Sequence, residues 1–112
     1  MRAVCSGDRA LAEELYADDA TLWQNTTAKT STKSEALQTI DWLYRTVQNL
    51  RYEAIERRVW DDGFLQEHRL VGTVAEGKEL VVHACMVVST RQGQIVEVRE
   101  YLDSKAFRVL RA

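Results

Sequence analysis

The residues best suited to chemistry lie in the segment FLQEHRLVGTV, residues 64–74, where four polar side chains interrupt an apolar run. The run is typical of a β-strand, in which successive side chains point to opposite faces. Gln66 and His68 therefore share one face. Glu67 and Arg69 share the other. Histidine titrates near neutral pH and can both give and accept a proton. Alternation alone leaves open which face points inward, because each face also carries apolar residues.

Other chemically able side chains are less well placed. His83 and Cys85 share one strand face, with Glu79 further along, but no third metal ligand can be placed beside them. Cys5 and Cys85 lack a paired motif, and a lone buried cysteine is usually a small hydrophobic residue. The sequence contains no glycine-rich phosphate loop, nucleophile elbow or nucleotide fingerprint. We therefore expect neither a metal nor a cofactor.

Composition indicates one globular domain spanning residues 1–112, with 46% hydrophobic and 29% charged residues. The net charge is −2 and the basic residues are scattered, so we expect no nucleic-acid partner. No apolar run is long enough to cross a membrane, and the first residues lack a signal-peptide core. Two cysteines favour a reducing compartment, and we expect a cytoplasmic protein.

The first half of the chain predicts two helices and one strand. A short helix is expected over residues 9–16, with Asp18 and Asp19 in a solvated turn before a strand in ATLWQN. Thr32 and Glu35 form a capping box that opens a longer helix over residues 33–48. Its apolar stripe comprises Ala36, Leu37, Ile40, Leu43, Tyr44 and Val47. Trp42 lies off this stripe, either as an isolated exposed aromatic residue or in contact with another chain.

From residue 50 the pattern changes to period two, which is typical of strands. Strands are predicted over residues 50–60, 64–75, 79–91 and 95–103, joined by three short glycine turns into an antiparallel meander. Residues 104–110 could form a helical tail. Helices followed by a long antiparallel sheet indicate the α+β class.

The strand ELVVHACMVV is apolar on both faces, so both faces of the sheet should be covered. The helices of this chain can cover one face. The simplest explanation for a covered outer face is a partner subunit. We therefore expect a homodimer through the outer face of the sheet.

With these elements in place, the chain resembles the SnoaL-like branch of the nuclear transport factor 2-like superfamily, over about residues 6–110. LYADDATLWQN, WDDGFLQEHRLVGTVAEG and GQIVEVREYLD carry the resemblance. The superfamily includes ketosteroid isomerase, scytalone dehydratase, SnoaL polyketide cyclases and limonene-1,2-epoxide hydrolase. The resemblance implies a cystatin-like fold, a cone-shaped, curved, antiparallel (mixed) β-sheet wrapped around N-terminal helices and enclosing an apolar cavity. Few residues precede Ser6, so we expect a shortened first helix and a more open cavity, unless the natural chain starts upstream.

The resemblance also selects the strand faces that point into the cone. It places Trp23 and Asn25 inside on the first strand, His68 on the central strand, and Val98 and Glu100 on the last. The expected lining of the cavity comprises Trp23, Leu43, Gln66, Leu70, Val82, Ala84, Met86, Val98 and Leu102.

The epoxide hydrolase is the nearest chemical comparison, and its catalytic set is only partly present. Asn25 is kept, Glu100 replaces the catalytic aspartate, and His68 replaces an arginine. Trp23 stands at the position of a tyrosine, and Leu70 at that of a second aspartate. Because the residue that protonates the epoxide is lost, the resemblance does not imply epoxide hydrolysis.

Of the residues that the resemblance places inside the cone, Glu100 and His68 are expected to form an acid–base pair, with Asn25 and Gln66 nearby. The ketosteroid isomerase base does not transfer, because Gln24 stands at its position. Burial raises the pKa of a carboxylate, and a neighbouring imidazolium lowers it. Such a pair could abstract a proton beside a carbonyl, activate water or protonate a leaving group.

Three functions stay open. The first is a cofactor-independent enzyme of the isomerase, cyclase, dehydratase or hydrolase type, acting on a small apolar molecule of polyketide, steroid or terpenoid size. The second is a protein that binds such a ligand without a reaction, where Glu100 and His68 only satisfy each other. The third is a dimerisation module with a vestigial cavity.

Overall fold

The computed structural model describes residues 13–110, and side chains as far as Arg108. Residues 13–15 are helical. The elements that follow are β1 (Tyr16–Gln24), β2 (Lys29–Thr32), α3 (Lys33–Thr46), β3 (Gln48–Trp60), β4 (Gly63–Thr73), η1 (Ala75–Gly77), β5 (Glu79–Arg91), β6 (Gln94–Leu102) and η2 (Ser104–Leu110). The predicted helix over residues 9–16 lies mostly outside the described residues, as do the shortened first helix and Cys5.

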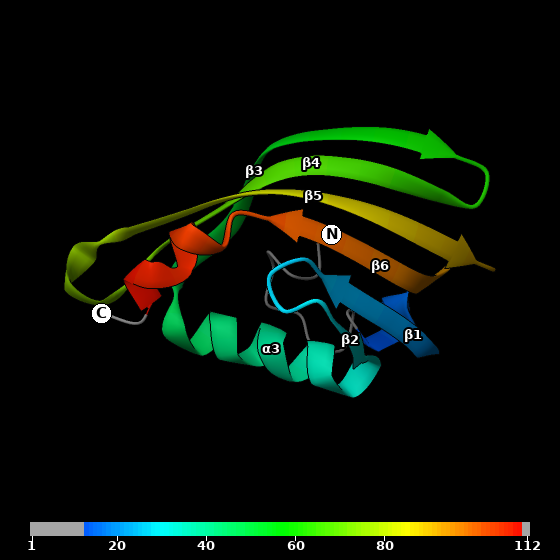
Figure 1. Ribbon diagram of the computed structural model, residues 1–112, viewed down its shortest axis with the longest axis horizontal. Helices are drawn as coiled ribbons and strands as arrows, with labels where there is room; N and C mark the ends of the chain where they lie inside the picture. Colours follow the sequence, from blue (N-terminus) through cyan, green and yellow to red (C-terminus); the bar gives the residue numbers. More distant parts are fainter. Residues whose placement is uncertain (1–12, 111–112) are drawn as a thin grey trace.

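One six-stranded sheet organises the chain, in the order β2-β1-β6-β5-β4-β3. All neighbouring strands are antiparallel except β1 and β6, which run parallel. The sheet arches over α3, which lies beneath its concave side together with η2 (Figure 1). The predicted α+β class and curved, mixed sheet are therefore confirmed, and so is the four-strand meander from β3 to β6.

Helix α3 begins and packs as its sequence predicts. The Thr32 hydroxyl accepts a hydrogen bond from the Glu35 amide, and the Glu35 carboxylate accepts one from the Thr32 amide, which completes the capping box. Ala36 and Leu37 are buried against the sheet. The helix ends at Thr46, two residues before the predicted end, because Val47 already has extended backbone angles.

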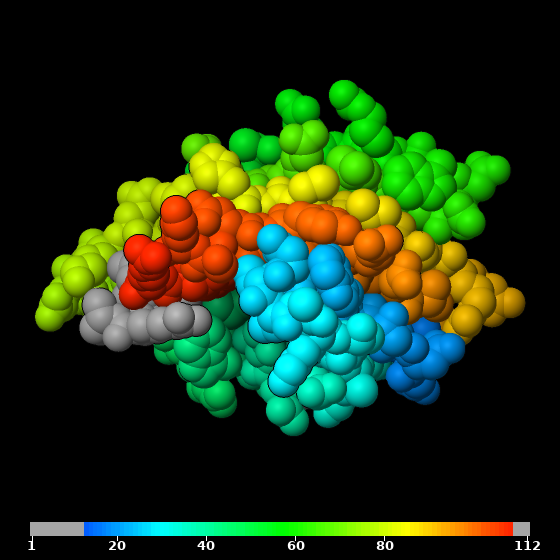
Figure 2. All heavy atoms as spheres, viewed as in Figure 1, coloured from blue at the N-terminus to red at the C-terminus, as the bar shows by residue number. Residues whose placement is uncertain are grey.

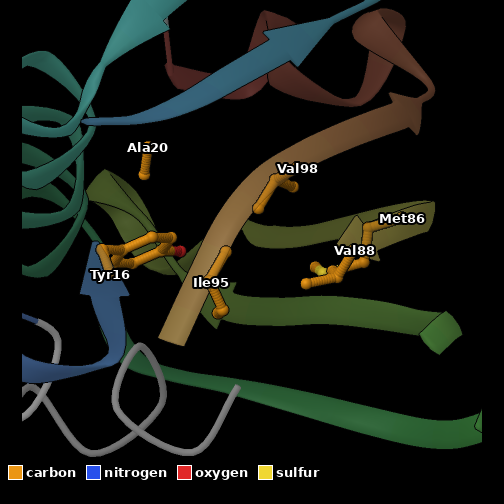
Figure 3. Close-up of a cluster of buried hydrophobic side chains, with 6 residues drawn as sticks. All are labelled: Tyr16, Ala20, Met86, Val88, Ile95 and Val98. Carbon is orange, nitrogen blue, oxygen red and sulfur yellow. The ribbon is translucent and has the colours of Figure 1, made fainter. Parts of the chain in front are cut away.

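The concave face of the sheet carries the core. On β5 the even-numbered residues Leu80, Val82, Met86 and Val88 are almost fully buried. Met86 and Val88 pack with Ile95 and Val98 of β6 and with Tyr16 and Ala20 of β1 (Figure 3). A fully buried side chain of this size stabilises the fold by about 1.5–3 kcal/mol. The odd-numbered residues Val81, Cys85 and Val87 lie half-buried on the outer face.

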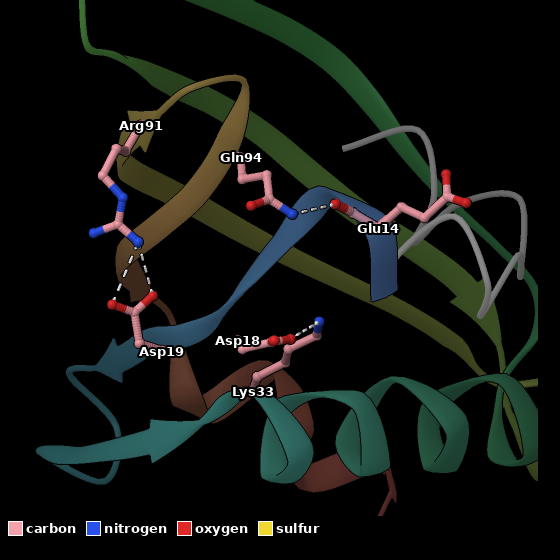
Figure 4. Close-up of polar contacts among 6 residues, drawn as sticks. All are labelled: Glu14, Asp18, Asp19, Lys33, Arg91 and Gln94. Atoms are coloured by element: carbon pink, nitrogen blue, oxygen red, sulfur yellow. Dashed lines mark hydrogen bonds and ion pairs between the residues drawn. The ribbon is translucent and has the colours of Figure 1, made fainter.

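Strand β1 corrects two predictions. Tyr16 begins the strand rather than ending a helix, and Asp18 and Asp19 lie within the strand rather than in a turn. Both aspartates are exposed, where the β1–β6 register shifts. Asp18 accepts a hydrogen bond from Lys33 at 3.2 Å and Asp19 one from Arg91 at 3.1 Å, while Gln94 donates to the backbone of Glu14 (Figure 4). Two adjacent exposed residues indicate a β-bulge, although Tyr16 and Ala20 on either side of it both face the core.

The last half of β3 extends beyond the rest of the molecule. Its residues are exposed from Ala54 onward, and Val59 reaches 74% exposure. Figure 2 shows the side chains of this edge standing clear of the other elements along the top of the view. None of the helices found in residues 13–110 is both long and apolar enough to cross a lipid bilayer.

Candidate functional site

A pocket of about 280 Å³ lies between α3 and the concave face of the sheet. Most of the predicted lining surrounds it. These residues are Leu43, Leu70, Val82, Ala84, Met86, Val98 and Leu102, and both His68 and Glu100 join them. Tyr16, Leu22 and Gln24 of β1 also line the pocket, and sequence reasoning missed them.

Two of the predicted site residues, Trp23 and Asn25, point away from the pocket, so their assignment to it is wrong. Trp23 packs edge-on against Tyr101 at 5.3 Å between ring centroids, with the Arg99 guanidinium 5.6 Å from its ring centre. The Asn25 side chain bonds the backbone of Leu102 and borders an open depression on the outer face. Asn25 therefore cannot hold a ligand or water in the pocket.

The register of β1 against β6 gives the inward face of β1. Leu22 lies opposite Val98 and Gln24 lies opposite Glu100. Residues opposite each other in neighbouring strands point to the same face, so Leu22 and Gln24 face inward. Alternation counted from buried Ala20 through Leu22 gives this face, and it is the signal that could have found Gln24.

Gln66 faces inward as predicted, but its side chain is fully buried and does not border the pocket. It lies behind His68 on β4 and bonds to that residue. Its role in the site is therefore indirect.

Glu100 is the acidic side chain that borders this pocket in the described part of the chain. Its Oε1 accepts a hydrogen bond from Gln24 Nε2 at 2.8 Å. Burial raises the pKa of Glu100 above its ordinary value, and the Gln24 hydrogen bond offsets this in part. Burial and the nearby Glu100 carboxylate also raise the pKa of Tyr16 well above its ordinary value. The site thus holds a carboxyl group whose pKa lies above the ordinary glutamate value.

His68 is held on two sides and is 5% exposed. Its Nδ1 lies 3.1 Å from Gln66 Nε2, and its ring stacks on Tyr52 with 4.1 Å between centroids and 21° between planes. Burial lowers the pKa of His68 to about 4. The imidazole is therefore neutral at pH 7, and Nε2 is the ring nitrogen left for a ligand.

No hydrogen bond joins Glu100 to His68, although both residues are among those described. Strand β5 separates them, with Met86 opposite Glu100 and Ala84 opposite His68. Two strand spacings and two residues along the strand place their Cα atoms roughly 12 Å apart. The expected direct pair is therefore not formed, and a ligand between the two groups would meet both.

The remaining candidates lie outside the pocket or at its rim. His83 is exposed on the outer face of β5, where Cys85 is half-buried and burial raises the pKa of its thiol. Within residues 13–110 no three His, Cys, Asp or Glu side chains gather as a metal-ion site would require. Trp42 is 44% exposed and borders the pocket. Its position is thus on the rim of the pocket.

This chain is similar to known proteins in its family and in its fold. A family model described as a SnoaL-like domain matches residues 1–98. Three similar solved structures are IdmH of Streptomyces antibioticus, a proposed polyketide cyclase; a proposed isomerase of Bacillus subtilis; and a Catenulispora acidiphila protein with a ketosteroid isomerase-like fold, in complex with trimethylamine. No curated protein matches the sequence significantly.

The similarity to these structures lies in the fold. IdmH has 17% identity and a TM-score of 0.84, covering 97% of this chain and 90% of IdmH. The Bacillus protein has 21% identity and a TM-score of 0.80, covering 98% and 85%. The Catenulispora protein has 17% identity and a TM-score of 0.77, covering 93% and 82%. At these identities the alignment establishes the shared architecture alone.

Proposed function

The chain belongs to the SnoaL-like domain family, and from this premise we propose that it catalyses cofactor-independent acid–base chemistry on a small apolar molecule. Glu100 is the general base, and His68 is a neutral hydrogen-bond donor. The observation that carries the proposal is the Glu100 carboxyl, which borders an otherwise mostly apolar pocket with its pKa raised by burial. A base with a pKa moved toward the working pH transfers protons most efficiently.

The reaction we propose begins with proton abstraction beside a carbonyl. The Glu100 carboxylate takes the proton from the carbon, the C–H electron pair forms a C=C bond, and the carbonyl π pair moves onto oxygen. His68 Nε2–H donates a hydrogen bond to that oxygen as its charge develops. If a second C=C bond is conjugated with the enolate, return of the proton from Glu100 to the γ carbon gives an isomer. If the enolate carbon instead attacks a second carbonyl, a C–C bond closes a ring, the π pair of that carbonyl moves onto its oxygen, and protonated Glu100 returns the proton to this alkoxide.

Pocket size narrows the ligand class. A volume of about 280 Å³ lies just below the roughly 300–1,000 Å³ typical of ligand pockets. Apolar side chains from the sheet, α3 and η2 form most of the wall. A molecule of one or two rings with a carbonyl group fits this space better than a four-ring steroid. The cyclase and isomerase names of the structural neighbours agree with this reaction class.

Deuterium exchange tests the proposal directly. We expect the protein to accelerate loss of the proton next to the carbonyl of 1-tetralone, a bicyclic apolar ketone, in D₂O as followed by NMR. The Glu100→Gln variant should lose at least about 100-fold of this acceleration. Glu97→Gln is the matched control, because Glu97 is exposed on the same strand. Equal exchange by wild type and Glu100→Gln would remove Glu100 from the reaction.

Binding without a reaction is the second candidate function. It is favoured by the partners of the two polar groups, because Gln24 already bonds Glu100 and Gln66 already bonds His68. A binding protein would take up 1-tetralone, yet exchange its protons no faster than buffer does.

We also propose that the protein forms a homodimer through the outer face of the sheet. This proposal is supported by the apolar residues on that face. Val81 and Val87 are half-buried there, and Tyr101 on β6 is 40% exposed. In an isologous dimer the same patch on a second copy would cover these apolar residues.

A further inference from the structure

A line of three polar side chains runs along the concave face from the edge strand to the pocket. Arg57 of β3 lies opposite Gln66 of β4. Its Nε and Nη2 donate to Gln66 Oε1 at 3.0 Å and 2.5 Å. Gln66 Nε2 in turn lies 3.1 Å from His68 Nδ1. The line joins an exposed cation to a fully buried amide and then to the pocket histidine.

The chemistry of these groups fixes the direction of every hydrogen bond in the line. A guanidinium has only donors, so the Gln66 oxygen must face Arg57. The Gln66 NH₂ group must then face His68, and an NH₂ group can only donate. His68 Nδ1 therefore accepts this bond with its lone pair. In a neutral imidazole with an accepting Nδ1, the proton is on Nε2.

We infer that Arg57 and Gln66 are positioning residues that hold His68 as the neutral Nε2–H tautomer, so that a hydrogen-bond donor faces the ligand. The inference rests on the proposed function for its use, since His68 Nε2–H is the group that would bond the ligand carbonyl. The tautomer itself follows from the hydrogen-bond line.

The surroundings keep the line in place. The Arg57 guanidinium also lies 5.0 Å from the centre of the Phe64 ring, a cation–π contact that orients it. Tyr52 stacks on the imidazole and prevents the ring from turning over. Any Nδ1-protonated form, the imidazolium included, would set an N–H against the Gln66 NH₂ with no acceptor between them. That clash acts in the same direction as burial and favours the neutral imidazole.

The tautomer can be measured without a ligand. The chain has two histidines, so ¹⁵N-histidine labelling gives two sets of ring signals, and His83→Gln identifies those of His68. At pH 7 we expect a pyridine-type shift for Nδ1 and a pyrrole-type shift for Nε2 in wild type. Arg57→Met frees the Gln66 amide to rotate and should yield a mixture of tautomers. Arg57→Lys retains a donor and should retain the wild-type pattern.

Two further variants sharpen the test. Gln66→Glu replaces the NH₂ with an acceptor, so His68 should become protonated on Nδ1. Arg58→Met is the matched control, because Arg58 is the exposed next residue of the strand on the opposite face, and it should change nothing. Circular dichroism establishes that each variant is folded.

Two results would overturn the inference. One is a wild-type His68 protonated on Nδ1 at pH 7, and the other is a folded Gln66→Glu or Arg57→Met variant with the wild-type pattern. If the variants fail to fold, the wild-type spectrum decides alone. Failure here is separable from failure of the proposed function, because the exchange assay tests Glu100 while the NMR spectrum reports only on His68.

Discussion

Gln24 and Glu100 lie opposite each other on the parallel strands β1 and β6, and the Gln24 amide donates a 2.8 Å hydrogen bond to the Glu100 carboxylate. The partner of this half-buried acid is thus a neutral amide. A cationic partner would hold the carboxylate ionised with a depressed pKa, as in an ordinary ion pair. An amide orients the carboxylate and offsets only part of the desolvation, so the pKa of Glu100 stays raised.

His68 should make the protein less stable in mild acid. The pKa of its imidazole falls from 6.5 to about 4 on folding, so the unfolded chain binds this proton more readily. Stability is therefore lost as the pH falls from 6.5 toward 4, by about 3 kcal/mol, at 1.36 kcal/mol per pKa unit. Urea unfolding of wild type and His68→Gln at pH 7 and pH 4 measures the difference.

His83→Gln is the control for that experiment, because His83 is exposed on the outer face. It should follow the wild-type pH dependence. A His68→Gln variant that loses as much stability as wild type between the two pH values would contradict the buried, neutral imidazole.

Filling the pocket should abolish ligand binding and leave the fold intact. Ala84 borders the pocket opposite His68, and Ala84→Leu adds three carbon atoms to the open space. Titration calorimetry should show 1-tetralone binding to wild type and none to the variant. Val87→Leu adds one carbon atom on the outer face of the same strand and should bind normally. Unimpaired binding by Ala84→Leu would place the ligand elsewhere.

The proposed dimer makes a separate prediction. A stable interface buries about 800 Å² on each partner, and a charge at its centre opposes association. Analytical ultracentrifugation should show a dimer for wild type and a monomer for Val87→Arg. Gln92→Arg, in the exposed β5–β6 turn, adds the same charge away from the sheet face and should stay dimeric. A monomeric wild type at micromolar concentration would rule out this interface.

Regular alternation made much of the fold and pocket predictable. The bounds of the strand over residues 79–91 follow from its sequence, and the resemblance selected the face that carries Val82, Ala84 and Met86, which line the pocket. The capping box at Thr32 likewise marked the start of α3 correctly.

The errors arose where structure depends on distant residues or on irregular backbone. The irregular backbone at Asp18 and Asp19 was missed, because two adjacent aspartates are equally typical of a turn. Gln24 bonds a residue 76 positions away, and no local pattern could reveal that contact. Strand β2 was missed because its sequence, KTST, has no apolar alternation. The contact of Arg57 with Gln66 could not be predicted from the sequence either, because Arg57 lies in a run of exposed residues.

The central claim is that the pocket carboxyl of Glu100 is an acid–base group tuned by burial, and its titration tests that claim most directly. ¹³C NMR of glutamate-labelled protein, with Glu100→Gln to identify the signal, follows the side-chain carboxyl from acid to neutral pH. We predict a midpoint clearly above the ordinary glutamate value of about 4.3, because burial raises the pKa of Glu100. A Glu100 midpoint at or below that ordinary value would contradict this claim.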